Sequence, residues 1–209
     1  MKQYIYSIAK PLPTSLKLSG RKYRLNLSFD RVLMFKELFQ NSDFSDRDKT
    51  DIAYSWLVKS PRKATNEEKE TVISVIVSDY LKQTNGSELP KPKRTAVNFL
   101  ADSKYIYADF KRYYGIDLLK KRGKLSWWEF ISMFDGLPQD SKIKEIMYIR
   151  TRELPEFNGS NLKEIMRVKE LQEYYFLEEN YEEIREEQEK GWDDIFSELD
   201  RKAGGLNNG

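Results

Sequence analysis

The 209-residue chain contains no cysteine and no histidine. Without cysteine there is no disulfide bond, no thiolate nucleophile and no zinc site built from thiolates. Without histidine the chain lacks the commonest general base and metal ligand, and with them the Ser-His and Cys-His catalytic pairs. We therefore predict that the protein is not an enzyme and that it carries no cofactor and no metal.

Long hydrophobic runs are also missing. No apolar stretch approaches the roughly 18 to 20 residues that cross a bilayer. Residues 1–8 are too short and too polar for a secretory signal. These two absences predict a soluble, cytoplasmic protein without a membrane partner.

The net charge of +2 conceals an uneven distribution of charge along the chain. Residues 1–100 carry a net charge of +7, residues 101–150 carry +3, and residues 151–209 carry −8. An acidic end on a mildly basic body is typical of an interaction tail or of an intramolecular cover.

Two basic clusters, residues 91–94 and 120–124, raise the question of nucleic-acid binding. Domains of that class are strongly basic, and phosphate neutralisation requires clustered lysine and arginine. The clusters here are short and the chain is nearly neutral, so the composition argues against a nucleic-acid-binding role.

The first structured segment is expected to be a β-hairpin at about residues 15–27. Residues 15–18 and 23–27 alternate apolar and polar side chains on either side of Ser19-Gly20, which is typical of two strands joined by a tight turn. An isolated hairpin is marginally stable in water, so it is expected to pack on helices.

Helices are predicted for most of the remaining chain, because capping residues precede stretches with apolar side chains at helical spacing. Residues 72–77 are rich in β-branched side chains, yet the preceding cap at Thr65 favours a helix there as well. The residues expected to cap or start helices are Ser28, Ser45, Thr65, Asp102, Ser126, Asp140 and Ser160. The fold class is therefore mainly α (α+β), with a single α-rich domain over residues 1–177 and an acidic helical tail over residues 178–209.

Candidate partner-binding residues lie in two places. Trp127 and Trp128 are adjacent at a helix start, where one could anchor a partner while the other packs in the core. In the acidic tail, a short amphipathic unit could dock on a partner or on a groove of the chain itself, or could form a C-terminal helix packed on the domain. Its apolar residues are Trp192, Ile195, Phe196 and Leu199.

A series of motifs in the centre of the chain resembles a known phage family. The series comprises Tyr105-Ile106-Tyr107-Ala108-Asp109-Phe110, Tyr114-Gly115-Ile116-Asp117-Leu118, Leu125-Ser126-Trp127-Trp128-Glu129-Phe130, residues 136–142 and Ile149-Arg150-Thr151-Arg152, preceded by Phe29-Asp30-Arg31. The resemblance covers roughly residues 12–175 and is to the "gene product fifteen" group of long-tailed phages and prophages of Gram-positive bacteria.

The resemblance implies a tail assembly chaperone, because members of this group are taken as such from their position between the major tail protein and tape-measure genes. The implied partners are the tape-measure protein and the major tail protein, with self-association of the chain. The implied location is the host cytoplasm, with the protein absent from the mature virion. Two alternatives are a structural virion component, such as a tail or connector protein, and a nucleic-acid-binding phage regulator.

Overall fold

The computed structural model describes residues 8–59, 63–81 and 94–180. These residues form a mainly helical fold with a small antiparallel sheet near the N-terminus, as the sequence predicted. They group into two compact units: unit 1 comprises residues 1–87 and 110–137, and unit 2 comprises residues 88–109 and 138–209. The extent of the predicted single domain, residues 1–177, stays a prediction.

The predicted hairpin is confirmed in unit 1. Strands β1 (Ser15–Leu18) and β2 (Arg21–Leu25) pair antiparallel, with Leu16 opposite Tyr23. The turn residues Ser19 and Gly20 both have positive φ angles, 47° and 75°, and this conformation matches the twist of the flanking strands. A third strand, β3 (Val58–Lys59), pairs with β2. A two-residue strand carries too little pattern to be predicted.

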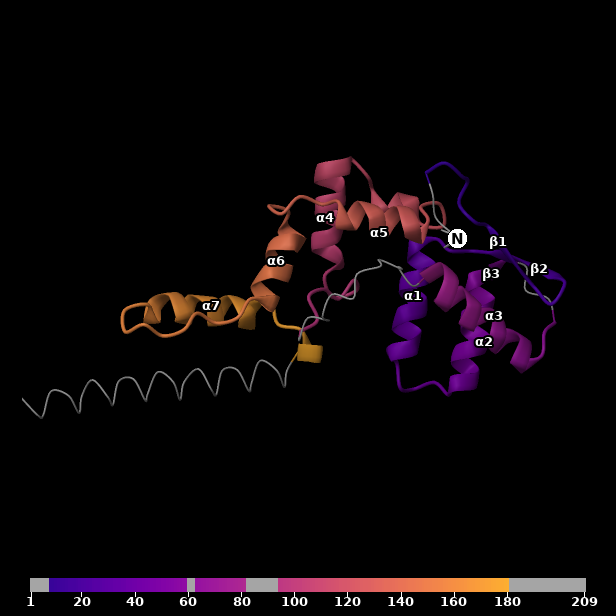
Figure 1. The fold of residues 1–209 in the computed structure, drawn as a ribbon, viewed down its shortest axis with the longest axis horizontal. Helices are drawn as coiled ribbons and strands as arrows, with labels where there is room; N and C mark the ends of the chain where they lie inside the picture. The colour runs from indigo at the N-terminus through magenta and orange to yellow at the C-terminus, as the bar shows by residue number, and fades with distance from the viewer. Residues whose placement is uncertain (1–7, 60–62, 82–93, 181–209) are drawn as a thin grey trace, which may run out of the picture. The chain divides into compact units, whose positions relative to one another are not determined.

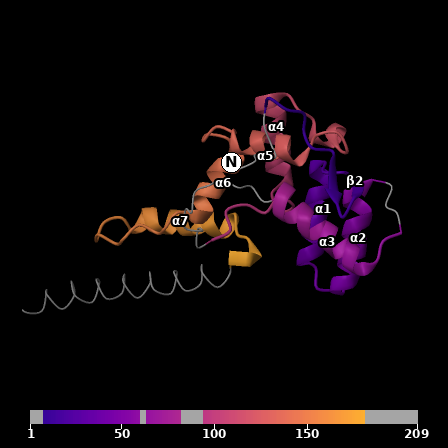
Figure 2. The same cartoon turned by 45° about the vertical axis from the view of Figure 1, so that its right-hand side comes forward.

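The other elements of unit 1 are helical. They are α1 (Phe29–Gln40), α2 (Asp46–Leu57), α3 (Asn66–Val75) with its π-helical extension η1 (Ile76–Leu81), the second half of α4 (Ser103–Tyr114), the 3-10 turn η2 (Leu118–Lys121) and α5 (Trp127–Asp135). Helices α1, α2 and α3 lie side by side in both views (Figures 1 and 2). Their apolar stripes meet in a core that includes Val32, Leu57, Val72 and Ile76.

Capping boxes begin two of these helices, as predicted. The Thr65 hydroxyl accepts the Glu68 N–H, and the Glu68 carboxylate accepts the Thr65 N–H. Ser126 and Glu129 make the same reciprocal pair at the start of α5. Each box satisfies two N–H groups that a helix start leaves without an intrahelical acceptor.

We expect Ser126→Ala to lower the free energy of unfolding by about 1 kcal/mol, because the substitution removes the hydroxyl acceptor at the N-cap of α5. Urea unfolding of the full chain measures this loss. Ser132→Ala, at an exposed position of the same helix, is the matched control and should not destabilise, since alanine favours a helix interior. Equal losses in the two variants would contradict a capping role for Ser126.

Unit 2 contains the first half of α4, helix α6 (Lys142–Thr151), helix α7 (Leu162–Tyr174) and the 3-10 turn η3 (Glu178–Asn180). Helices α6 and α7 pack against each other (Figure 1). The buried apolar residues of unit 2 come from α4, α6, α7 and the segment after α7: Ile106, Ile143, Ile146, Ile149, Ile165, Val168 and Leu177.

The prediction that Asp140 caps α6 is wrong. The N-cap residue is Ser141, and its side chain makes no capping hydrogen bond. The carboxylate of Asp109 accepts the N–H groups of Lys142 at 3.3 Å and Ile143 at 2.8 Å instead. Asp109 lies on α4, so a buried anion from a distant part of the chain satisfies this helix start.

Candidate partner-binding groove

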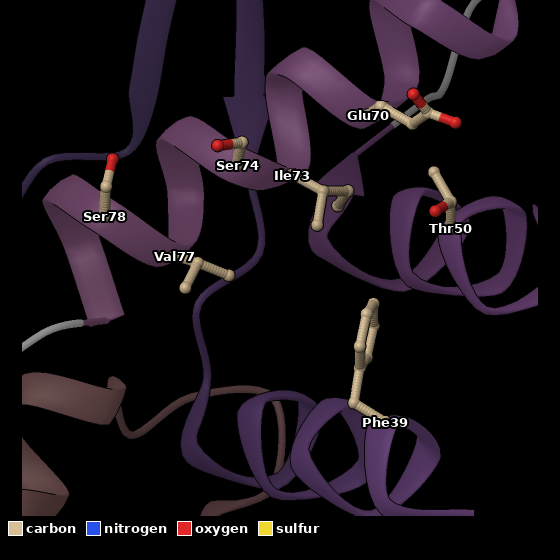
Figure 3. Close-up of a pocket in the computed structure, with 7 residues that line it drawn as sticks. All are labelled: Phe39, Thr50, Glu70, Ile73, Ser74, Val77 and Ser78. Atoms are coloured by element: carbon tan, nitrogen blue, oxygen red, sulfur yellow. The ribbon is translucent and has the colours of Figure 1, made fainter. Parts of the chain in front are cut away.

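An apolar groove lies among the helices of unit 1. Its volume is about 340 Å³, at the lower end of the range for ligand pockets, which suits one or two large side chains of a partner. Helix α1 contributes Phe39, α2 contributes Thr50, and the remaining wall comes from α3 and η1. The residues that line it are Phe39, Thr50, Glu70, Ile73, Ser74, Val77 and Ser78 (Figure 3).

Phe39 forms the exposed apolar wall of this groove. Figure 3 shows its ring rising from α1 toward Thr50 and Ile73. The side chain is 43% exposed, and its ring packs on that of Phe35, one turn earlier, with 4.7 Å between centroids. The Lys49 ammonium donates to the Phe39 carbonyl at 3.4 Å, joining the end of α1 to α2. The Phe39 ring therefore packs on the Phe35 ring while part of its surface remains exposed to solvent.

The opposite wall is built where α3 changes into the π-helix η1. A π-helical segment inserts extra backbone into a helix and is frequent at functional sites. Here it begins at Ile76, so Val77 and Ser78 follow the change and line the groove. The Tyr80 hydroxyl donates to the Ser15 carbonyl at 3.5 Å, which ties η1 to β1, and burial raises the pKa of Tyr80 above its usual value. The irregular wall is thus held against the sheet.

Predicted site residues Trp127 and Trp128 lie elsewhere in unit 1. Trp127 is 3% exposed and stacks on Phe130 with 5.7 Å between ring centroids. Trp128 is half-buried. The Lys36 ammonium lies 4.7 Å from the centroid of the Trp127 ring, and burial lowers the pKa of Lys36. Partner binding by either tryptophan stays a prediction, and Trp192, Ile195, Phe196 and Leu199 lie outside the described residues.

Sequence reasoning did not find the groove. Phe35, Leu38 and Phe39 follow the i, i+3, i+4 spacing of one apolar helix face. Nothing in the sequence therefore distinguishes Phe39, which lines the groove, from the buried positions beside it. The partners across the groove, Ile73 and Val77, look like ordinary core positions in the sequence, so only the packing of three helices brings them together.

Unit 2 holds a different feature, a buried ion pair. The Arg150 guanidinium donates two hydrogen bonds to the Asp102 carboxylate, at 2.6 and 2.8 Å, and both side chains are almost fully buried. Arg150 also donates to the carbonyls of Ala96 and Tyr175. The pair thus joins α6 to the start of α4 and to two loop segments, and both of its side chains are buried from solvent, so we assign it a structural role.

Close to this pair, the side-chain amide of Asn180 makes the two backbone hydrogen bonds that a neighbouring strand would make in a sheet. The Asn180 side chain accepts the Thr95 N–H at 2.7 Å and donates to the Thr95 carbonyl at 2.9 Å. Asn180 is 1% exposed. The amide therefore satisfies both backbone groups of Thr95 and fixes the end of the described chain to unit 2.

No group of three or more acidic side chains that could hold a metal ion occurs in residues 8–59, 63–81 and 94–180. Over the same residues, no helix combines the length and hydrophobicity that a membrane span requires.

Comparison with known proteins identifies one relationship. The model of the family described as Bacteriophage Gp15 protein matches residues 8–177. No curated protein and no solved structure matches the chain.

Proposed function

The chain belongs to the Bacteriophage Gp15 protein family, and from this membership together with the groove we propose that it is a non-catalytic tail assembly chaperone that binds the tape-measure protein. The family is a phage family and is not a known family of enzymes. The proposal places the protein in the host cytoplasm during tail assembly and outside the mature virion.

The observation that carries the proposal is the exposed apolar groove between α1, α2 and α3. Phe39, Ile73 and Val77 supply the apolar part of its lining, and 43% of the Phe39 surface is exposed. A groove of this kind accommodates the apolar ridge of an amphipathic helix, with one or two anchoring side chains inserted. Serine and threonine side chains at its border can satisfy polar groups beside the anchors.

A tape-measure protein is a fitting ligand on physical grounds. It is a long helical chain whose apolar surface is exposed until tail protein assembles around it, and exposed apolar patches aggregate. Several copies of a weakly binding chaperone along one chain would cover that surface through avidity. The major tail protein could then displace them, because each single contact is weak.

Co-expression with the tape-measure protein of the same phage tests the proposal. The native chain should hold the tape-measure protein in the soluble fraction and co-purify with it. Phe39→Asp combined with Val77→Asp should weaken binding about 30-fold, which corresponds to the loss of about 2 kcal/mol at an interface centre. Phe44→Asp combined with Ile8→Asp places the same two charges at exposed apolar residues outside the groove and should bind as the native chain does.

Two results would count against this function. One is aggregation of the tape-measure protein regardless of the native chain, and the other is retention of binding by the groove variant. The presence of the protein in purified virions in fixed proportion to the tail proteins would indicate a structural component instead.

A further inference from the structure

A strongly basic loop in unit 1 is not used by the proposed function. We call residues 119–124 the cationic loop. It carries Lys120, Lys121, Arg122 and Lys124, all of them exposed. Four positive charges lie within five consecutive residues of a chain whose net charge is only +2.

The backbone of the cationic loop is held in place. The Gly123 N–H donates to the Asp30 carboxylate at 2.8 Å, and Gly123 has a φ of +69°. Asp117 caps the turn η2 by accepting the Lys120 N–H. Leu118 and Leu125, on either side, are buried. The loop therefore presents its cations from a fixed backbone, which lowers the entropy lost when a partner binds.

Few of these charges are neutralised within the described structure. Asp117 lies 3.7 Å from Lys111 and 4.0 Å from Lys120. Across the described residues, no acidic side chain forms an ion pair with Lys121, Arg122 or Lys124. Leu119, beside them, is 61% exposed. Cations around an exposed leucine suit an acidic peptide with apolar side chains better than they suit a phosphate backbone, which offers no apolar partner.

A segment of that chemistry occurs in the chain itself. Residues 181–199 contain eight acidic and two basic side chains, a net charge of −6, together with the apolar residues Trp192, Ile195, Phe196 and Leu199. This segment follows Asn180, which is fixed to unit 2 through Thr95. Residues 181–209 can extend about 100 Å when fully stretched, which is enough to reach a neighbouring molecule.

We propose that the cationic loop of one copy binds the acidic segment, residues 181–199, of a second copy. Complementary charge steers the two surfaces together, and Leu119 offers an apolar contact within the basic surface. Each copy carries both the loop and the segment, so the contact can repeat from copy to copy. Its benefit for coverage of a tape-measure chain rests on the proposed function, because that function places several copies on one chain.

Sedimentation of the purified full-length protein tests the contact without any tape-measure protein. We expect concentration-dependent self-association at about 50 mM salt and at least about tenfold weaker association at 500 mM, because salt screens exposed charges. The variant K121E/R122E/K124E should weaken association to a similar extent. The control K17E/K22E/R24E makes the same change in net charge at exposed positions of the hairpin and should associate as the native chain does.

Charge exchange identifies the partner segment. Reversal of Glu182, Glu183, Glu186 and Glu187 to lysine should weaken association alone and should restore it when mixed with K121E/R122E/K124E. A native chain that stays monomeric at all concentrations would overturn the proposal, and docking within one copy would give that result. Binding to duplex DNA gives a second check. If K121E/R122E/K124E loses DNA binding but self-associates as the native chain does, the loop binds nucleic acid and the proposal is overturned. None of these outcomes depends on the chaperone function, so the two proposals can fail separately.

Discussion

Replacing Arg150 with alanine is expected to lower the free energy of unfolding of unit 2 by about 3–5 kcal/mol. The substitution leaves the Asp102 carboxylate buried without its cation, and removes the donors to the carbonyls of Ala96 and Tyr175. An uncompensated buried charge costs more than an unmade neutral hydrogen bond. Urea unfolding of the full chain measures the loss, and hydrogen exchange at residues 143–149 assigns it to α6.

Two further variants separate the ion pair from a general effect of charge. Arg167→Ala removes an exposed arginine of α7 in the same unit and should change the free energy of unfolding by less than about 0.5 kcal/mol. Arg150→Met combined with Asp102→Leu should cost less than Arg150→Ala, because no buried charge remains alone. A loss for Arg150→Ala no larger than that for Arg167→Ala would show that the pair contributes little.

The second large effect is expected at Phe130. We expect Phe130→Ala to destabilise unit 1 by about 3–5 kcal/mol. The side chain is 1% exposed, and its ring stacks on those of Phe29, Phe110 and Trp127 with centroids 5.0, 5.1 and 5.7 Å away. Truncation therefore leaves a cavity and removes three ring contacts, each of which adds to the effect of buried area alone.

Phe44→Ala is the matched control for Phe130→Ala, since Phe44 is exposed in the same unit. It should change the free energy of unfolding by less than about 0.5 kcal/mol. Phe130→Leu fills part of the cavity and should fall between the two. Urea unfolding compares the three variants, and similar losses for Phe130→Ala and Phe44→Ala would contradict the central place of Phe130 in the core.

Both predictions concern motifs that carried the family resemblance, and the structure gives those motifs a physical reason. Within unit 1, the Trp127 N–H donates to the Leu27 carbonyl and the Phe29 N–H donates to the Leu125 carbonyl, so the opening motif and the Trp-Trp motif pair. Within unit 2, Asp109 caps the helix that starts after Ser141. The signature is therefore largely a set of mutual packing and hydrogen-bonding requirements, and the exposed groove lies outside it.

Local chemistry was enough to predict much of the fold from the sequence. The hairpin followed from two alternating runs around Ser19-Gly20, because side-chain period and turn residues act over a few positions. The helix starts at Thr65 and Ser126 followed from capping boxes, where both partners lie within three residues. The helical state of residues 72–77 followed from the same cap, against the preference of β-branched side chains.

Only the tertiary structure decided the features that join distant residues. The capping of α6 by Asp109, the pairing of Asp102 with Arg150, and the strand β3 each depend on residues that the chain brings together from 33 or more positions apart. The groove has the same origin, since Phe39, Thr50 and Val77 come from three different helical segments. A single sequence shows directly which secondary structure each short segment prefers, so the helices and the hairpin were predictable. The groove and the long-range contacts depend on how those elements pack together, so the candidate site was not predictable.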